Sequence, residues 1–104
     1  MYEYNAKLIR CVDADTCVLD IDLGFYEWRL GQSYRLLRIN APEMNTDARK
    51  LAKTALEKFL IGKVLIAQTQ KSDSFGRFLV ELYADGKNVS DYLVESGYAV
   101  YKQY

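Results

Sequence analysis

The feature of this sequence that most constrains the fold is one amphipathic helical pattern set between two groups of short β-prone segments. The pattern runs from Thr46 to about Ile61. Its apolar residues recur at helical spacing: Leu51, Ala52, Ala55, Leu56, Phe59 and Leu60. Thr46 can cap the first turn, and Gly62 supplies a stop. One long helix among many strands predicts an α+β fold that is mainly β.

Five β-prone segments surround this helix and are bounded by turn signals. They cover residues 7–12, 16–22, 34–39, 63–70 and 77–83. Asp85-Gly86 follows the last of them as a strong hairpin turn, and Asn88 can cap a second, short helix. The order of three strands, a helix, two strands and a short helix predicts a small five-stranded barrel of the oligonucleotide-binding (OB) type. We expect one domain, residues 1–104.

The charge balance removes any whole-molecule attraction to nucleic acid. Fourteen basic residues match fourteen acidic ones, so binding of a polyanion must depend on a local basic patch. The first residues lack the basic and apolar regions of a secretory signal, and no apolar run approaches membrane-spanning length. We therefore expect a cytoplasmic protein with no membrane partner.

Cysteine and histidine usage narrows the chemistry further. Cys11 and Cys17 flank residues 13–15 symmetrically, so a hairpin would place them opposite one another. Two small buried thiols are favoured there over a disulfide. The lack of histidine and of a third cysteine disfavours a zinc site strongly, and the lack of histidine excludes histidine-based catalysis. General acid–base catalysis at neutral pH would then require a carboxylate, or a lysine or tyrosine with a shifted pKa.

Three polar stretches carry the candidate chemistry. They are DADT at residues 13–16, YRLLRINAPE at residues 34–43 and DSFGR at residues 73–77. Together they hold two acidic residues at a turn, a glutamate after a proline, and two arginines far apart in sequence. Cleavage of a phosphodiester needs this inventory: oxygen ligands for a divalent cation, a carboxylate base, and guanidinium groups on the phosphoryl oxygens.

Each stretch has a simpler explanation when it is taken alone. Asp13 and Asp15 are common turn formers. Arg35 could be an ordinary outward-facing strand residue, and Glu43 could be an acid that complements the start of a helix. These explanations predict no shared order along the chain. The occurrence of all three stretches in one chain therefore favours a functional site.

The order of these stretches resembles the staphylococcal nuclease (thermonuclease-like) family from about Lys7 onward. Residues 13–16 look like the family's Asp-Gly-Asp-Thr turn, and residues 35–43 look like its Arg-Leu-x-x-Ile-Asp-Ala-Pro-Glu stretch. Residues 75–77 look like its Tyr-Gly-Arg element. The resemblance implies the OB-type barrel with two helices. The third, C-terminal helix of the namesake nuclease is expected to be lacking, because the sequence stops at Tyr104.

The resemblance also implies a calcium site. Asp15 would be a Ca²⁺ ligand, and Asp13 would be an outer-sphere carboxylate that raises the local negative potential. Asn40 fills the position of the second metal carboxylate, and Ala41 would offer its backbone carbonyl. An amide oxygen can bind calcium but brings no charge, so the substitution by Asn40 predicts weaker metal binding.

The catalytic roles implied by the resemblance fall on three residues. Glu43 would be the general base, and Arg35 and Arg77 would stabilise the phosphoryl transition state. The implied substrates are DNA and RNA, with single strands preferred, and the implied acting species is a monomer. Tyr98 and Tyr101 are weaker candidates for substrate binding, since such tyrosines more often pack in a core or at a strand edge.

Two functions remain open from the sequence. The first is a calcium-dependent nuclease that does not discriminate between sugars. The second is a catalytically impaired barrel that binds single-stranded nucleic acid or a protein partner. Arg35, Glu43 and Arg77 favour the enzyme, whereas Asn40 and the zero net charge favour the binding module. Two further departures from the family pattern are Ala14 in place of glycine and Ser74 in place of lysine, which removes a cation from the cleft.

Overall fold

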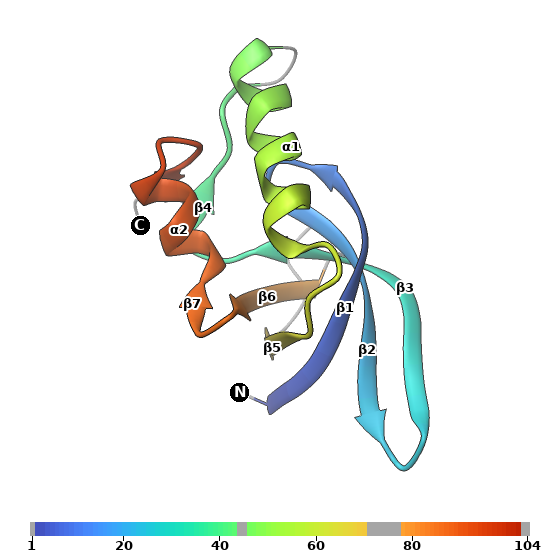
Figure 1. Cartoon of the computed structure of the whole chain (residues 1–104). Coiled ribbons are helices and arrows are strands. Elements are labelled where there is room, and N and C mark those ends of the chain that lie inside the picture. The colour runs from blue at the N-terminus through green and yellow to red at the C-terminus, as the bar shows by residue number, and fades with distance from the viewer. Residues whose placement is uncertain (1, 44–45, 71–77, 103–104) are drawn as a thin grey trace.

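Five strands form a closed β-barrel in the computed structural model, which describes residues 2–43, 46–70 and 78–102. The strands are β1 (Tyr2–Asp13), β2 (Thr16–Gly24), β3 (Glu27–Leu36), β5 (Leu65–Gln70) and β6 (Phe78–Ala84). Neighbours run antiparallel in the order β3-β2-β1-β5-β6. Parallel pairing of β3 with β6 then closes the barrel (Figure 1). The predicted five-stranded OB-type barrel is thereby confirmed.

The long helix forms where its capping signals predict it. Helix α1 (Asp47–Leu60) begins after the N-cap Thr46, whose side chain accepts a hydrogen bond from the backbone N–H of Arg49. Its face toward the barrel buries Ala52, Leu56 and Leu60. The apolar spacing along the sequence therefore identified the centre of the buried face, whereas Leu51, which was expected on that face, is exposed. No helix in the described part of the chain is long and apolar enough to cross a membrane.

The second helix and three short strands complete the fold of the described residues. Strand β7 (Lys87–Asn88) follows the predicted Asp85-Gly86 turn and leads into α2 (Val89–Glu95), which Asn88 caps. Strand β4 (Ile39–Asn40) pairs antiparallel with β8 (Val100–Tyr101). In Figure 1, β4 lies between α1 and α2.

The largest differences from the predicted strand boundaries are in β1 and β3. Strand β1 begins at Tyr2 rather than Lys7, because residues 2–6 pair with residues 65–69 of β5. Strand β3 begins at Glu27, directly after a tight two-residue turn, and ends at Leu36 rather than continuing to residue 39. The cause of this early end is Arg38, whose φ of 69° is left-handed. Long-range pairing and a local backbone reversal therefore set these boundaries.

Candidate active site

The turn between β1 and β2 presents one buried carboxylate. Asp15 is only 7% exposed, and the Thr16 hydroxyl donates to its Oδ1 atom at 3.1 Å. The backbone N–H of Leu36 donates to the Asp15 carbonyl at 2.9 Å, which ties the turn to the end of β3. Ala14 is buried and does not adopt a positive φ, so its Cβ adds no backbone strain. The turn therefore holds Asp15 rigidly without the glycine of the family pattern.

Two thiols lie behind this turn. Cys11 and Cys17 are directly opposed across the β1–β2 ladder, and both are buried. Their Sγ atoms are 3.8 Å apart and are not bonded. The hydrogen bond with Cys11 and burial together raise the pKa of the Cys17 thiol. The pair acts as packing beneath the turn, as expected from the sequence.

Arg35 brings the predicted site residues together. Its Nη2 atom donates to the Ile39 carbonyl at 3.0 Å and to Asn40 Oδ1 at 3.1 Å. The same nitrogen lies 3.5 Å from Asp15 Oδ2. The Nη1 atom donates to the Leu36 carbonyl at 2.7 Å. Oxygens from the β1–β2 turn and from β4 therefore converge on one cationic nitrogen.

The side chains around Arg35 include oxygen donors of the kind that a hard divalent cation binds. Asp15 supplies a carboxylate, Asn40 supplies an amide oxygen, and the carbonyl of Ala41 follows directly along the chain. Calcium accepts such mixed oxygen ligands and completes its shell with water in a loose geometry. The described residues contain no group of three or more acidic, cysteine or histidine side chains arranged around a common point. The residues thus fit a calcium ion held by few protein charges.

Asp13 is paired with a residue that the sequence did not single out. Both of its carboxylate oxygens accept from the Arg49 guanidinium, Oδ1 from Nε at 2.6 Å and Oδ2 from Nη2. This hydrogen bonding to Arg49 is the main reason why the pKa of Asp13 is lowered. The pair offsets the negative potential that the sequence led us to expect from Asp13. The only local hint of Arg49 is a cation in the first turn of a helix, where the dipole disfavours positive charge.

Glu43 lies in the short connection between β4 and α1. Its side chain is exposed, and its backbone carbonyl accepts a hydrogen bond from the Thr46 hydroxyl at 2.7 Å. The carbonyl of the preceding Pro42 accepts from Arg49 Nη1. Arg49 is thus in contact with both the acidic turn and the residue before Glu43. The carboxylate itself is open to solvent, as a group that must reach water requires.

The second predicted arginine, Arg77, lies outside the described residues, as does the rest of the DSFGR stretch at residues 73–77. The next residue along the chain, Phe78, opens β6 and pairs with Tyr34 of β3. Leu79 pairs with Arg35 in the same ladder. The strand that follows the DSFGR stretch is therefore the direct neighbour of the strand that carries Arg35.

The two candidate tyrosines occupy different surroundings. Tyr98 is half-buried and lines a pocket of about 190 Å³ together with Asn40, Ala41 and Pro42. Tyr101 is instead held by Asp91, because its hydroxyl donates to Asp91 Oδ1 at 2.8 Å. That hydrogen bond is the main cause of the raised pKa of Tyr101. Of the pair, Tyr98 is the one that lies beside the proposed metal ligands.

A second arginine network anchors β4 from behind. Arg38 donates to Glu81 Oε2 at 3.0 Å, to Asp91 Oδ1 at 3.1 Å and to Asn88 Oδ1 at 3.1 Å. Hydrogen bonding to Glu81 is the main reason why the pKa of Arg38 is raised. This left-handed residue connects β6 and α2 to the chain just before Asn40. Sequence reasoning missed it, since its partners are far away along the chain.

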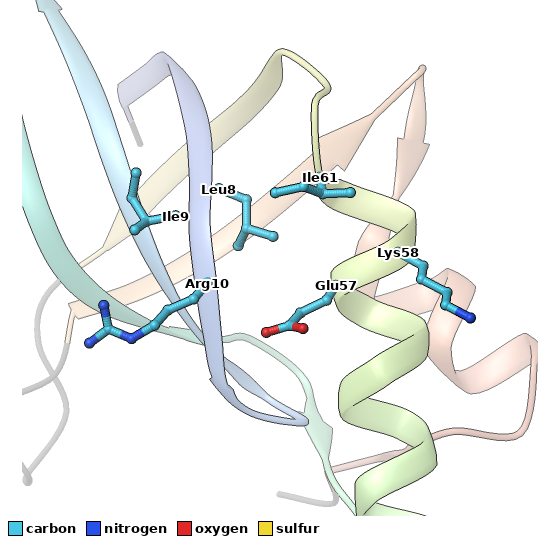
Figure 2. Close-up of a pocket in the computed structure, with 6 residues that line it drawn as sticks. All are labelled: Leu8, Ile9, Arg10, Glu57, Lys58 and Ile61. Carbon is cyan, nitrogen blue, oxygen red and sulfur yellow. The ribbon is translucent and has the colours of Figure 1, made fainter.

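A separate hollow of about 380 Å³ lies between β1 and α1, further back along β1 than Asp13. Figure 2 shows its lining residues: Leu8, Ile9, Arg10, Glu57, Lys58 and Ile61. The Glu57 carboxylate faces β1 there and accepts from the backbone N–H of Cys11 at 3.0 Å. This contact joins the helix to the barrel wall. The candidate catalytic groups lie elsewhere.

The closed barrel brings Asp15 and Asn40 to the Arg35 guanidinium, and the exposed residue Glu43 follows three positions after Asn40. The sequence matches the model of the "Staphylococcal nuclease homologue" family over residues 33–104. The chain belongs to the staphylococcal nuclease family, which is a family of nucleases acting on nucleic acid. The matched range includes Arg35, Asn40 and Glu43 and begins after the β1–β2 turn.

Curated relatives extend the similarity over the whole chain. An "Uncharacterized endonuclease" of Escherichia coli O157:H7 is 30% identical over 104 residues, which cover 98% of this chain and 64% of the relative. A protein of the same name in Escherichia coli gives the same values. A "Probable staphylococcal-like nuclease" of Oryza sativa subsp. japonica is 29% identical over 99 residues, which cover 93% of this chain and 23% of that protein. The chain thus spans about two-thirds or less of the length of these relatives.

Proposed function

We propose that this protein is a calcium-dependent nuclease that hydrolyses phosphodiester bonds in both DNA and RNA, prefers single strands and acts as a monomer. The observation that carries the proposal is the convergence of Asp15 and Asn40 on Arg35 at the barrel end that also presents Glu43. Membership of the nuclease family supports the reaction class. We add to this reaction class the dependence on calcium, the range of substrates and the monomeric state.

Asp15, Asn40 and the Ala41 carbonyl would hold the calcium ion. When bound, the ion would neutralise charge on the scissile phosphate. Arg35 is well placed to work beside it, because its guanidinium already lies next to both ligand side chains. Its contacts with the Ile39 and Leu36 carbonyls orient the planar group. An oriented guanidinium needs little reorganisation to stabilise charge that develops on phosphoryl oxygens.

Glu43 is the proposed general base. Its solvent-exposed carboxylate can remove a proton from an attacking water molecule, provided that the carboxylate is ionised. Pro42 restricts the backbone immediately before it. Arg77 is proposed as the second transition-state arginine on the strength of the family pattern alone. Tyr98 would stack on a base next to the cleft, which favours single strands because their base faces are open.

The test is cleavage of end-labelled oligonucleotides by the purified protein. Single-stranded DNA and RNA of equal sequence should both be degraded with calcium, and a chelator should stop the reaction. The duplex should be cleaved more slowly. Persistence of both single strands with calcium would contradict the proposal. The Glu95→Gln variant is a suitable control, because Glu95 is exposed on α2 and outside the site.

A second function is favoured by two observations. Asn40 removes a charge from the metal site, and Arg35 already makes contacts with four protein oxygens. These features suit a barrel that binds single-stranded nucleic acid without efficient cleavage. In that case fluorescence anisotropy would detect binding of a labelled single strand with or without calcium, and the strand would remain intact.

A further inference from the structure

One guanidinium joins three parts of the candidate site. Arg49 is in the first turn of α1, and it contacts the carboxylate of Asp13 at the end of β1 with two nitrogens. Its third nitrogen, Nη1, donates to the carbonyl of Pro42. The same side chain therefore links the helix start, the β1–β2 turn and the residue before Glu43.

The geometry distinguishes this contact from an ordinary surface ion pair. The side chains of Arg49 and Asp13 are 18% and 33% exposed, so both are largely shielded from solvent. A guanidinium that binds both oxygens of a carboxylate fixes the relative orientation of the two groups as well as their distance. The position is also unfavourable for a cation, because the helix N-terminus carries partial positive charge. The contacts with Asp13 and Pro42 are what hold the guanidinium there.

The charge of Arg49 also reaches the proposed metal ligand. Both Asp13 and Asp15 attract the guanidinium and contribute to its raised pKa, with the hydrogen bond to Asp13 as the main cause. A fixed positive charge near Asp15 must weaken the binding of any other cation there. Arg49 therefore has two consequences of opposite sign: it orders the connection that carries Glu43, and it opposes calcium.

We propose that Arg49 is a positioning residue that fastens the Pro42–Glu43 segment to the β1–β2 turn and so keeps the Glu43 carboxylate aligned with Asp15, while it lowers the calcium affinity of the site. The inference rests on the proposed nuclease function. It assigns no contact between Arg49 and the substrate. A residue of this kind changes turnover through the placement of the base, since a small misplacement of a catalytic group can cost up to about 10²-fold.

The decisive variant is Arg49→Met, which keeps the bulk of the side chain and removes both the charge and the donors. Its kcat should fall about tenfold or more with a nearly unchanged KM for a short single strand. Its calcium affinity, measured by calorimetric titration, should rise severalfold. Lys50→Met is the matched control, because it removes the same charge from an exposed neighbour on α1. That control should leave kcat near the parent value and change calcium affinity less.

Opposite changes in the two measurements separate positioning from mere structural damage. A damaged site would lose turnover and calcium affinity together, and that result would overturn the proposal. An unchanged kcat in Arg49→Met would overturn it as well. Arg49→Lys keeps the charge but not the fork. We expect this variant to retain calcium affinity near the parent value and to lose turnover.

Two measurements made without metal or substrate test the positioning role of Arg49 separately from the proposed nuclease function. In ¹H–¹⁵N spectra, the backbone resonance of Glu43 should shift in Arg49→Met and stay in place in Lys50→Met. In urea unfolding, Asp13→Asn and Arg49→Met should each lower the midpoint, and the double variant should lower it no further than the larger single effect. If the parent neither cleaves nor binds calcium, the proposed function fails. If the Glu43 resonance does not move, or if the midpoint change of the double variant equals the sum of the two single changes, the positioning role of Arg49 is wrong.

Discussion

Restoring a carboxylate at residue 40 should tighten calcium binding. The Asn40 amide oxygen lies 3.1 Å from Arg35 Nη2, and an Asp15 oxygen lies 3.5 Å from the same nitrogen. A unit charge about 4 Å from another is worth about 4 kcal/mol at an effective dielectric constant near 20. Asn40 is exposed, so solvent screens much of that energy. In Asn40→Asp, the new carboxylate would also pair with Arg35 before calcium arrives.

These losses leave an expected net gain of about 1–2 kcal/mol, which corresponds to roughly five- to thirtyfold in calcium affinity. Calorimetric titration of the parent and Asn40→Asp with calcium measures it directly. Activity should rise at limiting calcium and change less at saturation. Asn5→Asp is the matched control, because it adds the same charge at an exposed position on β1 outside the site. Equal affinities for the parent and Asn40→Asp would refute the placement of residue 40 at the ion.

Two further predictions concern Arg35 and Asp13. Replacing Arg35 by alanine should lower kcat about 10²-fold or more. Lysine at this position should restore little of the activity, because a point charge does not reproduce the paired donors of a guanidinium. A change in KM alone, measured by steady-state kinetics, would contradict this prediction. The folded-state pKa of Asp13 is lowered, so its pairing with Arg49 stabilises the fold above the unfolded-state pKa, and that stability is lost as the pH falls through the folded-state value. Urea midpoints of the parent and Asp13→Asn should therefore differ at pH 7 and approach one another as the pH falls through the folded-state pKa of Asp13. A constant difference would show that the pair does not contribute in this way.

Local sequence signals predicted most of the fold because they act over a few residues. Thr46 and Asn88 cap their helices as expected, and the Asp85-Gly86 turn forms where its residue types favour it. The early start of β1 could not be seen in the same way. Residues 2–6 become a strand through pairing with β5, which is distant in sequence and next to β1 only after the barrel closes.

The part of the candidate site that consists of short sequence motifs was predictable. Asp15 and Asn40, which the family resemblance assigned to one site, both lie within 3.5 Å of Arg35 Nη2. Arg49 and Arg38 were not predictable, because nothing in the local pattern separates them from other surface cations. Their importance arises from partners far along the chain, which the tertiary structure brings within hydrogen-bonding distance.

The central claim is that Glu43 acts as a base in a calcium-dependent nuclease site. Glu43→Gln keeps the shape of the side chain and removes its basicity, so the most direct measurement is the rate of single-strand cleavage by this variant at saturating calcium. We predict a loss of about 10²-fold or more, with strand affinity and calcium affinity close to those of the parent and Glu95→Gln unaffected. Cleavage by Glu43→Gln at the rate of the parent would contradict the account.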